Sequence, residues 1–214
     1  MYFQQSRPEM CAFLPESYTR VLEIGCGEGT FSKNLDSGQV VELWGIEPSK
    51  DAGSVAETQA YKVLYGTYED CFDWLPDNFF DLVICNDVIE HMVDHDHFFS
   101  SIKKKMQKNG FITGSIPNVR YYRNLKNLLL KKDWQYQNSG VLDRTHLRFF
   151  TEKSLLRTFK EHDYVVSSFS GINKARGFKL FIILALVFSF FSWKDIQYTQ
   201  FGFRISPKWS SLIF

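Results

Sequence analysis

The sequence predicts an α/β fold with a doubly wound, mostly parallel sheet, and two observations support this prediction. Short apolar runs alternate with helical patterns from Arg20 onward, which is the rhythm of βαβ units. A glycine-rich turn, Gly25 to Gly29, directly follows the first apolar run, as expected where a strand enters a helix beside a ligand. A length of 214 residues is enough for one domain with insertions, but it is short for two full domains. We therefore expect a single domain over residues 1–214.

The expected elements follow one another without an internal repeat. Strands are expected at 21–24, 40–46, 61–64, 81–85, 110–116, 164–169 and 197–205, and helices at 30–35, 49–58, 94–106 and 122–131. A further helix is expected after Thr151, which suits a helix cap and precedes apolar positions at helical spacing. Three segments lie outside this pattern: a cap at 1–19, an aromatic and basic insertion at 118–150, and an apolar insertion at 177–194. A loop as long as 118–150 is usually functional.

The first two strands end in residues suited to a nucleoside. The run Val21-Leu-Glu-Ile-Gly-Cys-Gly-Glu-Gly29 gives G-x-G-x-G, and Thr30 replaces the third glycine of the dinucleotide fingerprint. A dinucleotide places its pyrophosphate on the helix amino terminus, so this turn favours a nucleoside without phosphate. Glu47 follows the second strand, and its two oxygens can accept both hydroxyls of a ribose.

This segment closely resembles motif I of the class I S-adenosylmethionine-dependent methyltransferases. The resemblance implies a Rossmann-like methyltransferase fold with a seven-stranded sheet and S-adenosyl-L-methionine as cofactor. The segment Asn86-Asp-Val-Ile-Glu-His91 resembles the D-V-x-E-H segment of ubiquinone-biosynthesis-like members, in which the His packs near the methyl donor. The alternative for His91 is a residue that only hydrogen-bonds at a helix start. The resemblance implies cofactor contacts from Glu23, Gly25, Cys26, Gly27, Gly29, Glu47, Pro48, Thr67, Tyr68, Asn86, Asp87 and His91. Thr67 departs from the acid usual at its position, so Glu69, Asp70 or water is the alternative contact to the adenine amine.

A second resemblance concerns the methyl acceptor. The segments Arg7-Pro-Glu-Met10, Ser115-Ile-Pro-Asn118 and Gly140 to Thr151 are similar to a bacterial subfamily associated with O-antigen and capsule biosynthesis. This similarity implies methyl transfer to a hydroxyl of a sugar or glycan precursor. Asp143 and His146 are the candidate catalytic residues, since a His beside a carboxylate suits a general base. Two alternatives stay open: these residues only pin the loop, or the acceptor is a quinone-like or metabolite molecule methylated on oxygen or nitrogen.

Composition argues against several other functions. The net charge of +1 gives no electrostatic case for nucleic acid, and we interpret 103–105 and 131–132 as solvated basic helix faces. We expect no metal site, because Asp94 to His97 are consecutive residues at a helix start and diverge. Scattered cysteines and an amino terminus without an apolar run suggest the cytoplasm. A catalytically silent binding module and a nicotinamide-dependent oxidoreductase are disfavoured by the intact glycine turn and by Thr30.

Residues 180–191 are apolar apart from Ser189. A helix of this length spans about 18 Å, short of the roughly 30 Å hydrocarbon core, so we do not expect a membrane span. The alternatives are a lid over the acceptor, a homodimer contact, or a helix that lies on the inner face of the cell membrane. We prefer a packed or self-associating helix, with peripheral membrane contact second, because flanking lysines also suit an interface.

Overall fold

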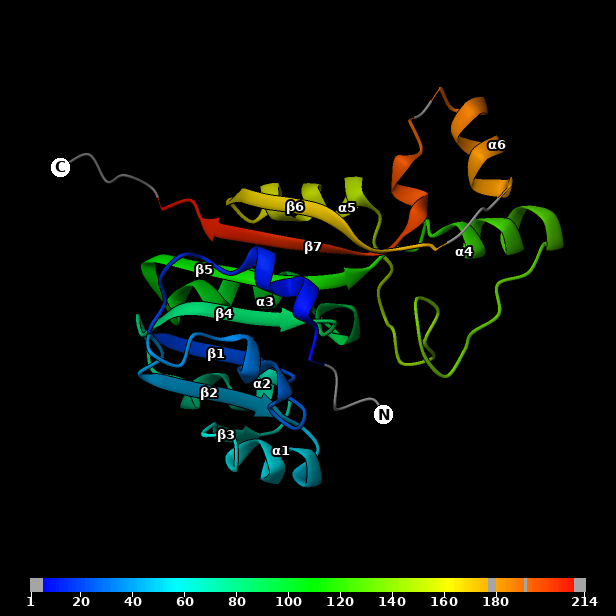
Figure 1. Ribbon diagram of the computed structural model, residues 1–214. Coiled ribbons are helices and arrows are strands. Elements are labelled where there is room, and N and C mark those ends of the chain that lie inside the picture. Colours follow the sequence, from blue (N-terminus) through cyan, green and yellow to red (C-terminus); the bar gives the residue numbers. More distant parts are fainter. Residues whose placement is uncertain (1–5, 177–179, 191, 210–214) are drawn as a thin grey trace.

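The computed structural model describes residues 6–176, 180–190 and 192–209. Its centre is a seven-stranded sheet in the order β3-β2-β1-β4-β5-β7-β6 (Figure 1). The strands are β1 (Arg20–Ile24), β2 (Glu42–Glu47), β3 (Lys62–Tyr65), β4 (Phe80–Asn86), β5 (Met106–Pro117), β6 (Tyr164–Lys174) and β7 (Tyr198–Pro207). β1 to β5 pair in parallel, whereas β7 runs antiparallel to both β5 and β6. The sheet is therefore mixed, and only β7 is reversed.

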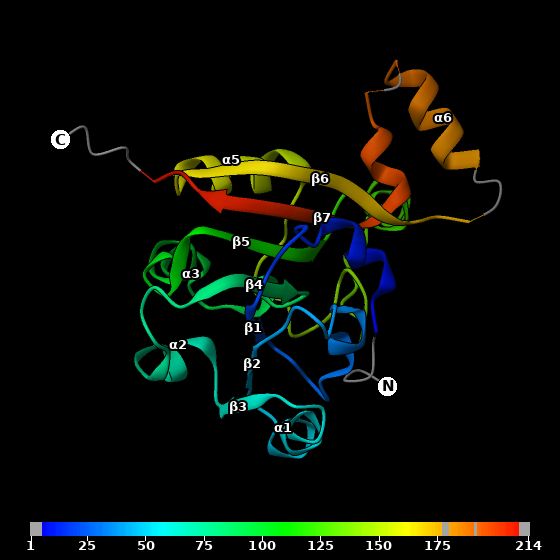
Figure 2. The same cartoon turned by 60° about the vertical axis from the view of Figure 1, so that its left-hand side comes forward.

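Helices cover both faces of the sheet (Figures 1 and 2). The α-helices are α1 (Lys50–Glu57), α2 (Tyr68–Cys71), α3 (His95–Ser101), α4 (Tyr122–Lys126), α5 (Glu152–Glu161) and α6 (Leu180–Phe188). Short 3₁₀ turns are η2 (Pro8–Phe13), η3 (Thr30–Asn34), η4 (Phe72–Trp74), η5 (Ile89–His91), η6 (Ile102–Lys104) and η8 (Lys194–Gln197), and η7 (Asn127–Lys131) is a π-helical turn. The cap predicted for α5 is confirmed, since Thr151 accepts a hydrogen bond from the Ser154 amide.

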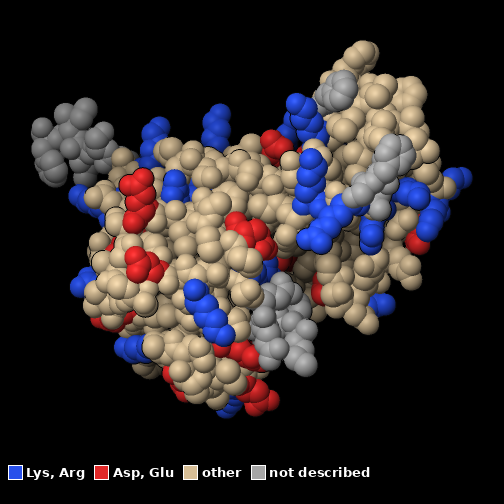
Figure 3. Space-filling view, in the orientation of Figure 1, with Lys and Arg blue, Asp and Glu red and all other residues tan. Residues whose placement is uncertain are grey.

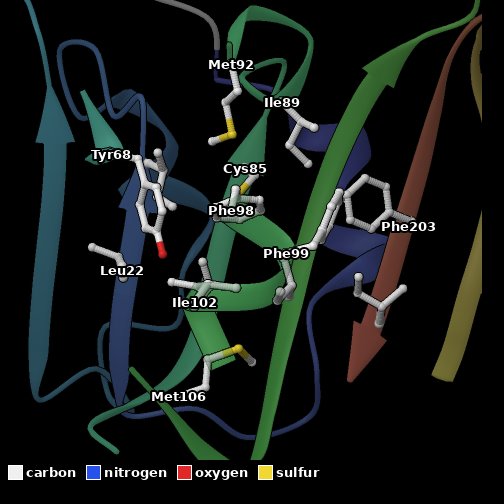
Figure 4. Packing of buried hydrophobic residues seen from close by; sticks show 14 of the residues in the cluster. Leu22, Tyr68, Cys85, Ile89, Met92, Phe98, Phe99, Ile102, Met106 and Phe203 are labelled. Atoms are coloured by element: carbon white, nitrogen blue, oxygen red, sulfur yellow. The ribbon is translucent and has the colours of Figure 1, made fainter. Parts of the chain in front are cut away.

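The main core lies between the sheet and the layer of α2, α3 and α5. Phe98 and Phe99 of α3 are fully buried there against the strands (Figure 4). A smaller core lies on the opposite face, where Met10 and Phe13 of η2 pack on β1 and β4. The amino-terminal cap is thus part of the folded domain from residue 6 onward, while 1–5 lie outside the described residues.

The expected helix at 94–106 is wrong at its carboxyl end. α3 stops at Ser101 and, after one 3₁₀ turn, Met106 already begins β5 by pairing with Phe80. Lys105 is not on a solvated face: it is 3% exposed, and its Nζ donates to the Leu75 carbonyl and to Asp77. A buried ammonium needs such partners, and the segment between η4 and β4 supplies both of them.

The insertions gather at the end of the sheet where β1, β2, β4 and β5 have their carboxyl ends (Figure 1). α4 and η7 begin the 118–150 insertion, and an irregular segment returns to the sheet at Phe150. α6 contacts this end through Ile182, which packs with Tyr122 and Ile196. Residues 177–179 and 191 of the predicted apolar insertion lie outside the described residues. Within the described part of the chain, no helix is both long and apolar enough to cross a membrane.

Candidate active site

A cavity of about 600 Å³ opens at the carboxyl ends of β1, β2 and β4. The predicted residues that line it are Glu23, Gly25, Cys26, Gly27, Glu47, Pro48, Asn86, Asp87 and His91. The candidate catalytic residue Asp143 lines it as well, together with Arg7, Thr30, Phe31, Val88 and Asn138, which the sequence analysis did not assign to the cofactor site. The Gly25 to Gly29 turn and the Asn86 to His91 segment, which are far apart in the chain, therefore meet in one site.

Glu47 holds the glycine turn in place. One carboxylate oxygen accepts a hydrogen bond from the Gly27 amide and the other from the Ser49 amide, both at 2.9 Å. Gly25 and Gly27 have φ angles of 70° and 54°, a region that glycine enters without strain. A Cβ on Gly25 would also lie 2.6 Å from a Val88 methyl group. Glycine is therefore required at this turn by conformation as well as by space.

Three residues predicted to contact the cofactor do not line this cavity. Gly29 precedes η3, and a Cβ there would lie 2.8 Å from the Tyr61 ring. Thr67 caps α2 in a capping box with Asp70, and Tyr68 is 2% exposed with its hydroxyl on Ser101. The local roles of these residues are packing and helix capping.

The cavity suits a cationic, polar ligand. Burial raises the pKa of Glu23 to about 8, and the Tyr61 hydroxyl donates to this carboxyl group. A positive charge nearby would offset that burial. The side-chain nitrogen and oxygen of Asn86 are buried with no hydrogen-bond partner within the described residues. Buried amides are normally paired, so a ligand with donor and acceptor groups would complete this wall.

Asp87 ties the cavity to the rest of the fold. Its backbone is left-handed, with φ of 52°, and its carboxylate lies 2.6 Å from the Arg7 guanidinium. The same carboxylate accepts hydrogen bonds from the Ser115 hydroxyl and the Gln200 amide. Four segments of the chain, the amino-terminal segment, β4, β5 and β7, are thereby joined at one side chain.

A second cavity of about 480 Å³ adjoins the first. The two cavities share Arg7, Asp87 and Asp143. The remaining lining residues of the second cavity are Glu90, Pro117, Tyr121, Arg123, Asn124, Asn127, Gln137, Ser139, Gly140, Val141, Leu142, His146, Thr199 and Gln200. Half of these carry amide or hydroxyl groups and come from the 118–150 insertion or β7, which suits a ligand rich in hydroxyls.

Asp143 and His146 both line this second cavity, but their side chains hydrogen-bond to different partners. Asp143 accepts hydrogen bonds from the Thr145 amide and hydroxyl at 2.9 and 2.7 Å. Although burial raises the pKa of Asp143, these hydrogen bonds lower it below its usual value. The Nδ1 of His146 lies 3.1 Å from the Val141 carbonyl, so Nδ1 carries the proton and Nε2 is the basic nitrogen. Burial lowers the pKa of His146, which keeps this ring neutral at pH 7.

Backbone amides and the Arg148 side chain, rather than Asp143 and His146, attach this part of the insertion to η5 and to the residues that follow it. The Glu90 carbonyl accepts hydrogen bonds from the Leu147 and Arg148 amides, and the Arg148 guanidinium donates to the Val93 carbonyl. The contacts of Asp143 and His146 with Thr145 and Val141 are local to the insertion. Pinning of the loop therefore does not require the basic nitrogen of His146.

Glu90 is a site residue that the sequence did not identify. It is 1% exposed, and neither carboxylate oxygen has a hydrogen-bond partner within the described residues. Burial, followed by the nearby charge of Asp87, raises the pKa of Glu90 well above its usual value. Its position in the D-V-x-E-H segment was the available signal, but the pattern alone does not reveal that the side chain is buried and turned toward His146.

Comparison with known proteins agrees with this geometry. The family described as "Methyltransferase domain" matches residues 3–168. A possible histamine N-methyltransferase from Thermotoga maritima has a TM-score of 0.64 at 19% identity, with 97% of this chain and 89% of that chain covered. S-adenosylmethionine-dependent methyltransferases from Archaeoglobus fulgidus and Mesorhizobium loti have TM-scores of 0.64 and 0.65, at 17% and 14% identity. Coverage of this chain and of theirs is 93% and 90% for the former, and 94% and 96% for the latter. A search of curated protein sequences finds no match.

The raised pKa of Glu23 predicts a specific pH dependence of stability. Between about pH 4.5 and 8 the folded protein keeps Glu23 protonated while the unfolded chain ionises it. The folded state then binds more protons, so the contribution of Glu23 to stability falls as pH rises through this window, by at most about 1.4 kcal/mol per pH unit. We expect the Tm of the wild type to fall more between pH 5 and 8 than that of Glu23→Gln. Equal Tm changes in the two proteins would contradict a protonated Glu23.

Proposed function

The chain belongs to the methyltransferase domain family and is an S-adenosylmethionine-dependent methyltransferase; from this premise we propose that it methylates a hydroxyl of a sugar or glycan precursor in bacterial surface-polysaccharide biosynthesis. The observation that carries the proposal is the second cavity, whose wall includes seven amide or hydroxyl side chains, those of Tyr121, Asn124, Asn127, Gln137, Ser139, Thr199 and Gln200. Such groups hydrogen-bond to a polyhydroxyl ligand. A quinone-like acceptor would offer these side chains far fewer hydrogen-bonding groups than a sugar does.

The first cavity has residues that fit the cofactor. Glu47 is placed to accept from the ribose hydroxyls, and the Gly25 to Gly27 backbone leaves room beside it. Glu23 and Asn86 offer acceptors and a donor to the amino-acid end. When bound, S-adenosylmethionine supplies an already electrophilic methyl group, so the protein has to align the acceptor and help to remove its proton.

We assign the catalytic role to His146 and Asp143, whose positions suit the point where an acceptor would meet the methyl group. Asp143 lines both cavities, and His146 lines the second. The neutral ring of His146, with its proton on Nδ1, presents Nε2 as a base for an acceptor hydroxyl. Arg123 and the side-chain amides around it would orient the sugar ring. A small metabolite methylated on oxygen or nitrogen remains the alternative substrate.

We further propose that α6 brings the enzyme to an anionic membrane surface, where lipid-linked glycans reside. Most of its apolar side chains are exposed, including Phe188 at 80%, and Leu128 to Leu130 of the neighbouring η7 are exposed as well. Lys and Arg side chains gather around this protrusion (Figure 3). Seven of them lie on the adjoining elements, and we call them the basic rim: Arg123, Lys126, Lys131, Lys132, Lys174, Arg176 and Lys194. In a two-fold homodimer formed through α6, the basic rims of the two subunits would face each other and their positive charges would repel. Anionic lipid would instead attract the basic rim.

The cofactor assignment predicts the effect of two substitutions in the first cavity. Glu47→Ala should weaken S-adenosylmethionine binding by about 1.5–3 kcal/mol, because charge-assisted hydrogen bonds to a buried ligand are lost. Gly27→Val should abolish binding, since valine does not tolerate the φ of 54° and fills the turn. Calorimetry measures both affinities. Glu57→Ala, at the exposed end of α1, is the matched control, and unchanged affinity in both test variants would remove Glu47 and the turn from the cofactor site.

A methyl-transfer screen tests the proposed reaction. Nucleotide sugars, lipid-linked sugars and quinols are offered as acceptors, and S-adenosylhomocysteine release is measured. We expect release with a sugar acceptor, and we expect His146→Ala to lower kcat about 10²-fold or more while cofactor affinity stays unchanged. Exposed His97 provides the control variant His97→Ala. Turnover with quinols alone would contradict the sugar proposal, and an unchanged kcat with lower Tm would assign His146 a purely structural role.

Vesicle flotation tests the membrane proposal. We expect the wild type to float with vesicles containing anionic lipid, and to do so less at high salt because screening weakens the attraction of the basic rim. A Val187→Lys/Phe188→Lys variant should stay in solution, whereas Trp74→Lys, which changes an exposed residue far from α6, should float as the wild type does. A dimer in light scattering that stays off the vesicles would instead favour self-association.

A further inference from the structure

Glu90, His91 and His146 form a cluster that the methyl-transfer proposal leaves only partly explained. One ligand-type atom from each residue lies within 4.8 Å of the others. The His146 Nε2 is 3.9 Å from a Glu90 carboxylate oxygen, and the two imidazole rings meet edge to face at 4.7 Å between centroids. Glu90 and His91 come from η5, and His146 comes from the insertion.

Both imidazoles are oriented by backbone carbonyls. The His91 Nδ1 lies 3.1 Å from the Thr145 carbonyl, and the His146 Nδ1 lies 3.1 Å from the Val141 carbonyl. In each ring this contact places the proton on Nδ1 and makes Nε2 the basic nitrogen. An Nδ1–H bound to a carbonyl with Nε2 as ligand is the arrangement usual for metal-binding histidines.

The carboxylate of Glu90 supplies an independent observation. It is 1% exposed, it points toward the His146 Nε2, and both of its oxygens lack a hydrogen-bond partner within the described residues. Buried carboxylates are normally paired or bound to metal. Neither a hydrogen-bonded structural role nor contact with solvent accounts for this side chain.

We propose that Glu90, His91 and His146 bind a divalent transition-metal ion, of the zinc or manganese kind, where the two cavities meet. Two His and one carboxylate are a known ligand set for such ions, and they leave positions open for a substrate oxygen. Ligand atoms about 2.1 Å from a shared tetrahedral ion lie roughly 3.4 Å apart. The 3.9 Å between Glu90 and His146 therefore closes with a small side-chain rotation. Mg²⁺ and Ca²⁺ prefer sites made wholly of oxygen and fit less well.

The place of the ion gives it a role in the proposed reaction, and this role, unlike the binding itself, rests on the proposed function. His91 lines the first cavity, and Glu90 and His146 line the second. An acceptor hydroxyl bound to the ion becomes more acidic. With ion and cofactor bound, Asp143 would take the proton of this hydroxyl, the oxygen would form a bond to the methyl carbon, and the sulfur–methyl bond would break with its electron pair left on sulfur. In this state Nε2 of His146 is a ligand, and the general-base role passes to Asp143.

Metal titration without cofactor or acceptor tests the site directly. Protein with its affinity tag removed is stripped with chelator and titrated with Co²⁺, which is followed by calorimetry and by its visible absorption. We expect one equivalent to bind to the wild type. Glu90→Gln, which preserves shape, and His146→Ala should each weaken binding by more than about 100-fold, because loss of an outer-shell partner alone costs 10–100-fold. His97→Ala should bind Co²⁺ as the wild type does.

Two results would overturn the metal site: no stoichiometric Co²⁺ binding by the wild type, or unchanged affinity in Glu90→Gln. S-adenosylmethionine affinity, measured in each variant, shows that the variant is folded. A protein that binds Co²⁺ but methylates no sugar would keep the site and reject the proposed substrate. Sugar methylation that is unaffected by chelator, in a protein that does not bind Co²⁺, would reject the site and keep the proposed substrate.

Discussion

The ion pair between Arg7 and Asp87 is the interaction on which the rest of the site depends. It connects the amino-terminal segment to the end of β4, and the same carboxylate accepts from Ser115 and Gln200. Asp87 adopts a left-handed backbone, which costs about 1 kcal/mol or more for a residue other than glycine. Its contacts to β5 and β7 compensate for this cost. The turn that follows, η5, therefore leaves the sheet in a fixed direction and carries Glu90 and His91 to the boundary of the two cavities.

The insertion completes the site because it docks on η5 through main-chain atoms. Leu147 and Arg148 donate to the Glu90 carbonyl, and the Thr145 carbonyl meets His91. Main-chain bonds do not depend on the identity of the side chains between them, so the residues of the insertion that line the second cavity can change without loosening the loop. The same docking explains why His146 lies beside Glu90, although 56 positions separate them in the chain.

The sequence was sufficient for the parts of the structure that depend on local pattern. Buried strands and the glycine turn appear directly as apolar runs and G-x-G-x-G spacing, and Glu47 follows because parallel strands end at one edge. Contacts between distant segments were not predictable in this way. Arg7 acquires its role from a partner 80 residues away, and Lys105 is buried only because β5 begins one residue later. At Thr67 a readable signal was overlooked, since Thr67-Tyr-Glu-Asp70 matches the capping-box pattern.

The distribution of charge gives the two cavities different preferences. Glu23 and Glu47 place acidic groups in the first cavity, whereas Arg7 pairs with Asp87 at the boundary. A cationic ligand in the first cavity offsets the burial of Glu23 and favours its ionised form. Methyl transfer removes the positive charge from the sulfonium, so the same acidic groups attract the product less than the substrate. Under the proposed assignment, the first cavity would favour binding of the charged cofactor and release of the neutral thioether, and the second cavity would distinguish acceptors by hydrogen bonding.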